Sequence, residues 1–176
     1  MLARMWTLAL LVVLAAPAPR GLAVGDTLPA LSGTNLDGQA LTLPAAARGR
    51  VSLIAVGFSE GSRLAVQAWV HRFIADFGAN PAVACYEVRM IGRFGALARP
   101  FTEGGMSRGV APEDRARVIP HYGGTSLWKR RLGFEREGDA YLVVLDNRGR
   151  VALLHHGPFL DSNYENLAAV VQRLRR

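Results

Sequence analysis

The stretch Val51–Phe77, VSLIAVGFSEGSRLAVQAWVHRFIADF, decides the fold that we predict for this chain. Its first eight residues, VSLIAVGF, are apolar and rich in β-branched side chains, which is typical of a strand buried on both faces. SEGSR predicts a sharp turn, and LAVQAWVHRFIADF places apolar residues at three- and four-residue steps along one face of a helix. A strand that feeds a helix in this way is a βα unit, and ligands bind in the crevice beyond the carboxyl end of its strand.

The segments beside this unit predict further elements. Upstream, Asp37-Gly38 is a good turn pair for a short hairpin. Downstream, Gly78 is placed to cap the end of the helix, and Pro81 prevents the helix from continuing. Residues 82–91 then predict a second core strand, parallel to the first because a helix joins the two.

Residues 92–139 form a long connection broken by glycine and proline. Pro112, followed by two acidic residues, is typical of a helix start. Ser126 is predicted to cap a second short helix that ends near Gly133. A connection of this length within a compact domain is either functional or mobile.

The last third of the chain predicts a β-hairpin and a helix. Strands 141–145 and 151–155 flank the turn sequence DNRGR, and Ser162 with Glu165 forms a capping box at the start of the final helix. The predicted fold is therefore α/β, with a central mixed sheet flanked by helices: a βαβ unit, a helical connection, a β-hairpin and a C-terminal helix.

The first 23 residues have the layout of a secretory signal peptide. Arg4 precedes an apolar run over 7–16, and Gly21-Leu22-Ala23 offers the small residues that a signal peptidase prefers, which makes Val24 the first mature residue. The run is shorter than the ~20 residues of a membrane-spanning helix. We therefore expect 1–23 to be a signal peptide, 24–176 to be a single domain, and the protein to be exported to a bacterial periplasm. The alternative is an uncleaved segment that anchors it to the inner membrane.

The charge excludes little. Removing Arg4 and Arg20 leaves 19 basic residues against 14 acidic ones, a net charge of +5. No basic run is interleaved with aromatic residues as a nucleic-acid groove requires, so we expect no nucleic-acid partner. Peripheral contact with an anionic membrane surface stays open. The oligomeric state is not indicated by the sequence.

Cysteine and histidine offer little chemistry. Cys85 is the only cysteine, so the chain has no internal disulfide and no resolving thiol, and its place in an apolar strand is typical of a buried residue. His155 and His156 are neighbours on a strand and therefore point to opposite faces. Neither His71 nor His121 has a Cys or His at ligand spacing. We expect no metal and no cofactor.

Residues 25–175 resemble the secreted thioredoxin-like and peroxiredoxin-like proteins. The resemblance rests on the arm GDTLPAL, the hairpin LDGQALTL, the βα unit and the hairpin YLVVLDNRGRV. It implies a thioredoxin-like fold. In such proteins the turn after the first core strand holds two cysteines separated by two residues, where this chain has Ser59 and Ser62. A cis-proline precedes the third core strand, where this chain has Ala140, and cis peptides are very largely restricted to X-Pro bonds.

A narrower resemblance is to the mitochondrial ATP-synthase assembly factor called ATPase complex subunit ten and its bacterial relatives. It rests on the thiol-free stretch 59–69, Trp69 followed by Phe73, the helix end Phe77-Gly78, and TSLWKRRLGF leading into AYLVVLDNRGRVALLHHGPF. The chain departs from that pattern in its last strand, where VALLHH lacks the tryptophan expected after the Gly-Arg pair. The resemblance implies a protein that helps a membrane complex to assemble.

The leading hypothesis is an exported, non-catalytic thioredoxin-like protein that binds a protein partner, with a membrane complex as the candidate. One alternative is a thiol-dependent oxidoreductase or peroxiredoxin-like enzyme that uses Cys85. Another is an anion-binding module at the helix N-terminus near Arg63. We expect the serines of the turn to cap the helix rather than to catalyse. The candidate binding residues are Ser59, Glu60, Gly61, Ser62, Arg63 and Trp128, and no catalytic residue is predicted.

Overall fold

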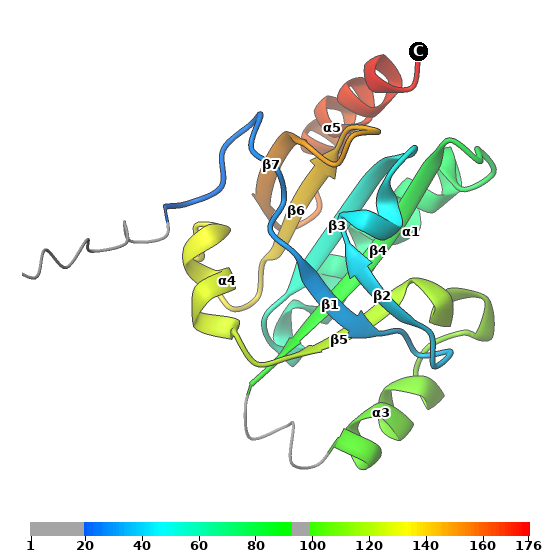
Figure 1. Ribbon diagram of the computed structural model, residues 1–176, viewed down its shortest axis with the longest axis vertical. Helices are drawn as coiled ribbons and strands as arrows, with labels where there is room; N and C mark the ends of the chain where they lie inside the picture. Colours follow the sequence, from blue (N-terminus) through cyan, green and yellow to red (C-terminus); the bar gives the residue numbers. More distant parts are fainter. Residues whose placement is uncertain (1–19, 93–98) are drawn as a thin grey trace, which may run out of the picture.

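A five-stranded mixed sheet forms the centre of the molecule in the computed structural model, which describes residues 20–92 and 99–176 (Figure 1). In chain order the elements are β1 (Leu31–Thr34), β2 (Ala40–Leu43), η1 (Ala45–Ala47), β3 (Val51–Gly57), η2 (Glu60–Ser62), α1 (Arg63–Phe77), β4 (Val83–Ile91), α3 (Arg99–Arg108), η3 (Pro112–Arg117), β5 (Val118–Tyr122), α4 (Thr125–Arg131), β6 (Ala140–Leu145), β7 (Val151–Gly157) and α5 (Asp161–Leu174).

The strands lie in the order β5-β4-β3-β6-β7. β4 is parallel to β3 and β5 is parallel to β4, whereas β6 is antiparallel to both β3 and β7. β3 and β7 therefore run in the same direction, and their carboxyl ends share one edge of the sheet. The predicted βαβ unit, C-terminal hairpin and final helix are confirmed.

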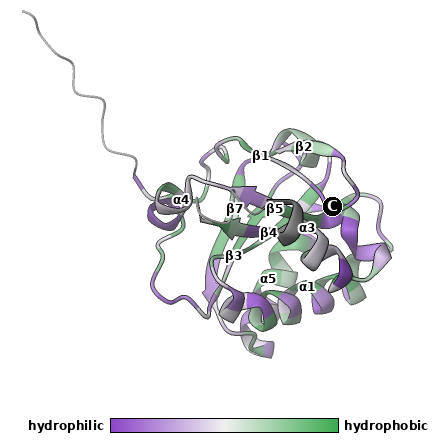
Figure 2. Cartoon of the chain, turned by 90° about the horizontal axis from the view of Figure 1, so that it is seen from below, coloured by the Kyte–Doolittle hydropathy of each residue, from purple (hydrophilic) through white to green (hydrophobic). Residues whose placement is uncertain are grey.

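The sheet separates two buried clusters. α1 and α5 cover one face, and the β1–β2 hairpin and α4 cover the other (Figure 2). Every residue of β3 and of β6 is buried, as expected for strands covered on both faces. The apolar stripe of α1 packs onto the sheet through Val66, Trp69, Val70, Phe73 and Phe77.

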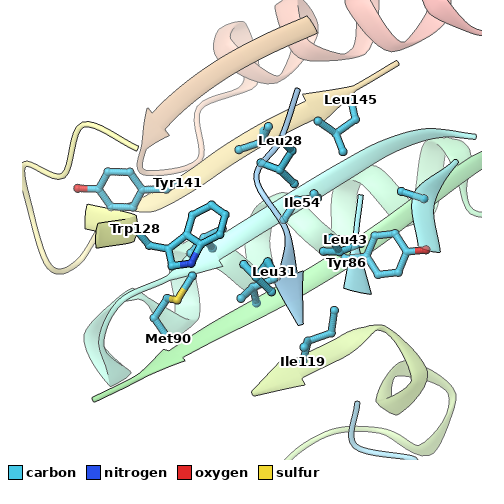
Figure 3. Close-up of a cluster of buried hydrophobic side chains, with 14 of the residues drawn as sticks. Leu28, Leu31, Leu43, Ile54, Tyr86, Met90, Ile119, Trp128, Tyr141 and Leu145 are labelled. Carbon is cyan, nitrogen blue, oxygen red and sulfur yellow. The ribbon is translucent and has the colours of Figure 1, made fainter. Parts of the chain in front are cut away.

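The hairpin face of the sheet is closed by residues that are distant in sequence. Leu31 and Leu43 from the hairpin meet Ile54 of β3 and Ile119 of β5, as Figure 3 shows. Trp128 of α4 completes the cluster and is only 4% exposed. A short helix with a buried tryptophan therefore serves here as part of the core.

The long connection contains two elements that the sequence analysis missed, β5 and α3. β5 has the sequence VIPHY, and Pro120 removes one backbone donor from it. Proline is tolerated in an edge strand, and β5 lies at the edge of the sheet. Val118 and Ile119 are fully buried, so two apolar residues suffice to fix this strand.

Two predicted helix caps are wrong. α4 begins at Thr125, after Gly124 in a left-handed conformation with φ +63°, so Ser126 lies inside the helix and does not cap it. α5 begins at Asp161 after Leu160, without a side-chain cap, so the expected box between Ser162 and Glu165 does not form. In contrast, Gly78 does end α1, and its N–H donates to the Ile74 carbonyl at 2.8 Å.

The start predicted at Pro112 is confirmed, but the helix it opens is the 3-10 helix η3 rather than an α-helix. The predicted signal segment, 1–23, falls for the most part outside the described residues. Within 20–92 and 99–176 no helix has the length and hydrophobicity needed to cross a membrane.

Candidate functional site

The candidate site is the turn between β3 and α1. β3 ends at Gly57, Ser59 follows in an extended conformation, and η2 leads directly into α1 (Figure 1). Gly57 permits the turn to fold back closely, since a Cβ atom at this position would lie 2.7 Å from the Ser62 Oγ atom. The turn therefore lies at the carboxyl end of a central parallel strand, where α/β sheets bind ligands.

The two serines of the turn cap each other's backbone. Ser59 Oγ accepts a hydrogen bond from the Ser62 N–H at 3.3 Å, and Ser62 Oγ accepts one from the Ser59 N–H at 3.4 Å. Each hydroxyl proton is also engaged, because Ser62 Oγ donates to the Ser59 carbonyl at 2.8 Å and Ser59 Oγ donates to the Glu137 carbonyl at 2.7 Å. Both hydroxyls therefore cap the start of the helix, as expected. Their protons are donated to backbone carbonyls, which cannot act as a general base to activate a nucleophile.

The charged residues of the turn pair with each other. Arg63 Nε donates to Glu60 Oε1 at 2.7 Å, and the same guanidinium reaches Gln67 at 3.4 Å. Glu60 places its carboxylate beside the helix N-terminus, where an anion would otherwise bind. The side chain of Arg63 is therefore already partnered by an acid, which disfavours the anion-binding alternative.

An exposed leucine lies beside this turn. Leu64, in the first turn of α1, is 70% exposed, although the apolar stripe of the helix starts at Val66. Leu160, before α5, is 52% exposed and follows β7, whose carboxyl end shares an edge of the sheet with that of β3. Neither leucine is among the binding residues predicted from the sequence. The exposure of Leu64 could have been predicted from the sequence, because Leu64 lies outside the apolar stripe of the helix.

A cavity of about 290 Å³ opens beside the turn. An ion pair of β4 lines this cavity, in which Arg89 Nε donates to Glu87 Oε1 at 2.6 Å. Glu87 is 5% exposed, so this carboxylate is desolvated and held by its neighbour. The residues that line the cavity are Gly57, Ser59, Glu60, Ser62, Arg63, Val66, Glu87, Arg89, Met90, Ile91, Gly92 and Met106.

Ala140, the residue at the predicted cis-proline position, is fully buried at the start of β6. Among the described residues the cis peptide is Leu43–Pro44, which lies in the hairpin region and not before β6. The connection that precedes β6 still packs against the turn, through the hydrogen bond from Ser59 to the Glu137 carbonyl.

Cys85 lies far from the turn. It pairs with Leu53 in the parallel register of β3 and β4, four residues before Gly57, or about 13 Å along the strand. Burial raises the pKa of its thiol to about 12, although the neighbouring Arg117 opposes that shift. The thiol is therefore protonated at neutral pH and is a poor nucleophile.

The structure brings together five of the six predicted binding residues, Ser59 through Arg63. It places the sixth, Trp128, in the core on the hairpin face, and this corrects its assignment to a partner surface. The Trp128 ring is buried, and the guanidinium of Arg131 lies over it, 5.2 Å from the ring centroid.

No metal centre is apparent in the part of the chain that the structure describes, since it contains no group of three or more His, Cys, Asp or Glu suited to hold an ion. His155 and His156 do point to opposite faces. His155 packs against Trp69 with ring centroids 5.3 Å apart, and His156 stacks on Tyr141 at 5.5 Å.

Neither the protein-family models nor the curated proteins match this sequence. Solved structures do. The thioredoxin domain of a thiol-disulfide oxidoreductase from Bacteroides vulgatus is similar over 86% of this chain and 99% of that one, with 16% identity and a TM-score of 0.57. The pneumococcal exposed lipoprotein thioredoxin from Streptococcus pneumoniae is similar over 83% of this chain and 100% of that one, with 13% identity and a TM-score of 0.57.

A third similar structure is BsSco, described as a member of the Sco family of cytochrome c oxidase assembly proteins. The similarity covers 89% of this chain and 97% of that chain, with 12% identity and a TM-score of 0.56. At these identities the likeness concerns the fold. Together with the sheet order and the flanking helices, it establishes that the chain has a thioredoxin-like fold.

Proposed function

We propose that this protein is an exported, non-catalytic thioredoxin-like protein that binds another protein through the surface around the β3–α1 turn. The observation that carries the proposal is the reciprocal capping of Ser59 and Ser62, because both hydroxyls are committed to backbone groups at the position of a redox pair. The lone thiol, Cys85, lies at the other end of the sheet, and its raised pKa keeps it protonated.

The binding surface that we propose consists of the exposed residues Glu60, Gly61, Leu64 and Leu160. Exposed apolar patches mark protein-interaction sites, and Leu64 and Leu160 follow the carboxyl ends of β3 and β7, which share one edge of the sheet. The exposed ion pair of Glu60 and Arg63 directly precedes Leu64 in the chain, and polar residues of this kind form the rim of apolar contacts in protein interfaces. The surface thus suits a partner that offers an apolar anchor.

Two of the similar proteins support the proposed location of the protein and its proposed role in assembly. One is described as an exposed lipoprotein, which agrees with the signal peptide expected at 1–23. Another belongs to a family of cytochrome c oxidase assembly proteins, which agrees with a role in assembling a membrane complex. We propose such a complex as the partner and a bacterial periplasm as the place.

Site-specific photocrosslinking in cells would test the proposed binding surface. A photoreactive residue in place of Gly61 should capture a protein partner, and Leu64→Glu should reduce that capture at least tenfold because it puts a charge into the apolar contact. Val24→Glu is the matched control: Val24 is 68% exposed, next to Gly25, whose N–H bonds the first residue of β7 at the opposite end of the sheet. Equal capture by all three proteins would contradict the proposed surface.

A thiol-dependent oxidoreductase is the second candidate, because two of the similar structures are described as a thiol-disulfide oxidoreductase and a thioredoxin. This candidate requires Cys85, the only thiol of the chain. Turnover of peroxide or of a disulfide substrate by the purified protein, abolished by Cys85→Ser, would establish the second candidate and displace the first. Under our proposal the wild type and Cys85→Ser are equally inactive.

A further inference from the structure

A second cavity, of about 770 Å³, lies at the opposite end of the sheet from the turn. It exists because β5 pairs with β4 only from Glu87 to Ile91. The preceding half of β4, Val83–Tyr86, has no strand on that side within the described part of the chain. η3 passes there instead, and the space between η3 and the strand remains open.

The walls of this cavity differ in character. One wall is apolar and comes from the end of α1 and from β4, through Ile74, Phe77 and Cys85. The other is polar and carries Arg50, which precedes β3. The two walls lie on opposite faces of β4, because Cys85 and Tyr86 are successive residues of the strand, and the cavity runs past the edge of β4 that β5 leaves unpaired, from one wall to the other. A cavity of about 300–1,000 Å³ that combines apolar residues with a few polar groups is typical of a small-molecule site.

Arg50 is a half-buried guanidinium whose described partners are all neutral. Its Nη2 atom donates to the Ala46 carbonyl at 3.0 Å and to the Tyr86 hydroxyl at 2.8 Å. The Tyr86 hydroxyl donates in turn to the same carbonyl at 2.9 Å, at the edge of the cluster in Figure 3. Among residues 20–92 and 99–176, no ion pair to Arg50 is formed.

An unpaired, partly desolvated charge is unfavourable, and an acidic ligand would relieve it. Within the described residues Arg50 donates through Nη2 alone, so the planar guanidinium retains donors for a carboxylate. Tyr86 and the Ala46 carbonyl fix the orientation of the guanidinium, so a ligand would bind without the entropic cost of ordering this side chain.

Two other polar residues that line the cavity, Asn35 and Arg117, have structural partners, and the acidic Glu113, which also lines it, is exposed to solvent. Asn35 is 5% exposed, accepts from the backbone N–H groups of Asp37 and Gln39, and donates to the Ala116 carbonyl at 2.9 Å. Arg117 pairs with Asp114 at 3.4 Å. Arg50 is thus distinguished from these lining residues by its unneutralised charge.

We propose that this cavity binds a small organic carboxylate with an apolar portion. The carboxylate pairs with Arg50, and the apolar portion packs against Ile74, Phe77 and Cys85. This site is separate from the surface around the turn. Evidence for or against ligand binding here therefore leaves the proposed function unaffected.

Cys85 provides the readout, because it is the only thiol and it lines the cavity. Because its raised pKa leaves little thiolate at neutral pH, we would work at about pH 9, where the thiolate fraction is larger, and measure the rate at which iodoacetamide alkylates the thiol in the purified full-length protein, with hexanoate, hexanamide or inorganic phosphate added. Hexanoate should slow the alkylation at least fivefold at saturation. Hexanamide lacks the charge and phosphate lacks the apolar portion, so neither should protect at the same concentration.

Arg50→Gln should weaken the protection by hexanoate at least tenfold, as expected for a lost charge-assisted hydrogen bond. Arg148→Gln, which removes the same charge from an exposed hairpin tip, is the matched control and should bind as the wild type does. Arg50→Lys, which keeps the charge without the planar fork, should retain part of the affinity. It keeps the test valid if Arg50→Gln fails to fold by circular dichroism.

Three results would overturn the proposal. One is alkylation unaffected by hexanoate, the second is equal protection by hexanamide or phosphate, and the third is unchanged protection in folded Arg50→Gln or Arg50→Lys.

Discussion

Ser59 joins three segments through one hydroxyl group. Its Oγ atom caps η2 and also donates to the Glu137 carbonyl in the connection before β6. Losing a cap of this kind costs about 1 kcal/mol of the free energy of unfolding, within a range of about 0.5–2 kcal/mol. We therefore expect Ser59→Ala to destabilise the protein by about 1–2 kcal/mol in urea denaturation.

Ser126→Ala is the matched control for that measurement. Ser126 is exposed and does not cap α4, so its loss should change the free energy of unfolding by less than about 0.5 kcal/mol. A cost at Ser126 equal to that at Ser59 would contradict the two cap assignments.

Gly57 and Ser62 should be coupled. A Cβ atom on residue 57 would lie 2.7 Å from Ser62 Oγ but 3.8 Å from Ser62 Cβ. Gly57→Ala should therefore cost about 1–3 kcal/mol in the wild type, as overpacking does. In a Ser62→Ala background the added cost should fall below about 1 kcal/mol. A double-mutant cycle with denaturant measures this coupling, and strictly additive costs would contradict the contact.

The capping role of the two serines in the turn could be predicted from the sequence, because capping depends on local geometry. The role of Trp128 could not, because a tryptophan beside three basic residues is equally compatible with a surface helix and with a core contact. Only the position of α4 against the β1–β2 face decides between them, and that position depends on residues distant in sequence.

The contact between α1 and α5 depends on a hydrogen bond with a defined response to pH. Tyr164 of α5 donates to Asp76 of α1 at 2.7 Å. That bond, with help from the ion pair to Arg72, lowers the pKa of Asp76 below its usual value, against the opposing effect of desolvation. A carboxyl group with a lowered pKa stabilises the folded state at pH values above its unfolded pKa, and this contribution is lost as the pH falls through the folded pKa.

Tyr164→Phe should therefore destabilise the protein at neutral pH, with a penalty that shrinks as the pH falls below about 4. Denaturant unfolding of both proteins at a series of pH values measures the difference. Tyr141→Phe is the control, because the hydroxyl of Tyr141 bonds only to backbone groups of Glu135 and Arg136. Its penalty should not follow the titration of Asp76, and a Tyr164→Phe penalty that grows in acid would contradict the assignment.

β3 and α1 could be predicted because the apolar pattern that determines their burial lies within one continuous stretch of sequence. β5 was missed because it depends on two buried residues and a proline that is tolerated only at a sheet edge. α3 was missed because Gly104 and Gly105 lie within it, and glycine opposes helix formation.

The whole molecule separates two features that redox proteins of this fold combine. The turn with its capped serines lies at the carboxyl end of β3, whereas the only thiol lies about 13 Å back along the sheet. The sequence indicated the missing thiol pair. It did not indicate the cavity beside Cys85, because that cavity follows from where β5 begins to pair with β4.

Introducing a thiol pair at the turn tests our proposal that this thioredoxin-like fold carries serines where redox proteins of the fold carry cysteines, and therefore catalyses no thiol-disulfide exchange. Reduction of insulin disulfides by dithiothreitol would be measured with the wild type, with Ser59→Cys/Ser62→Cys and with Ser59→Cys alone. We expect acceleration only by the double variant, because the N-terminus of α1 lowers the pKa of a thiol placed there. Acceleration by the wild type, or none by the folded double variant, would contradict the proposal.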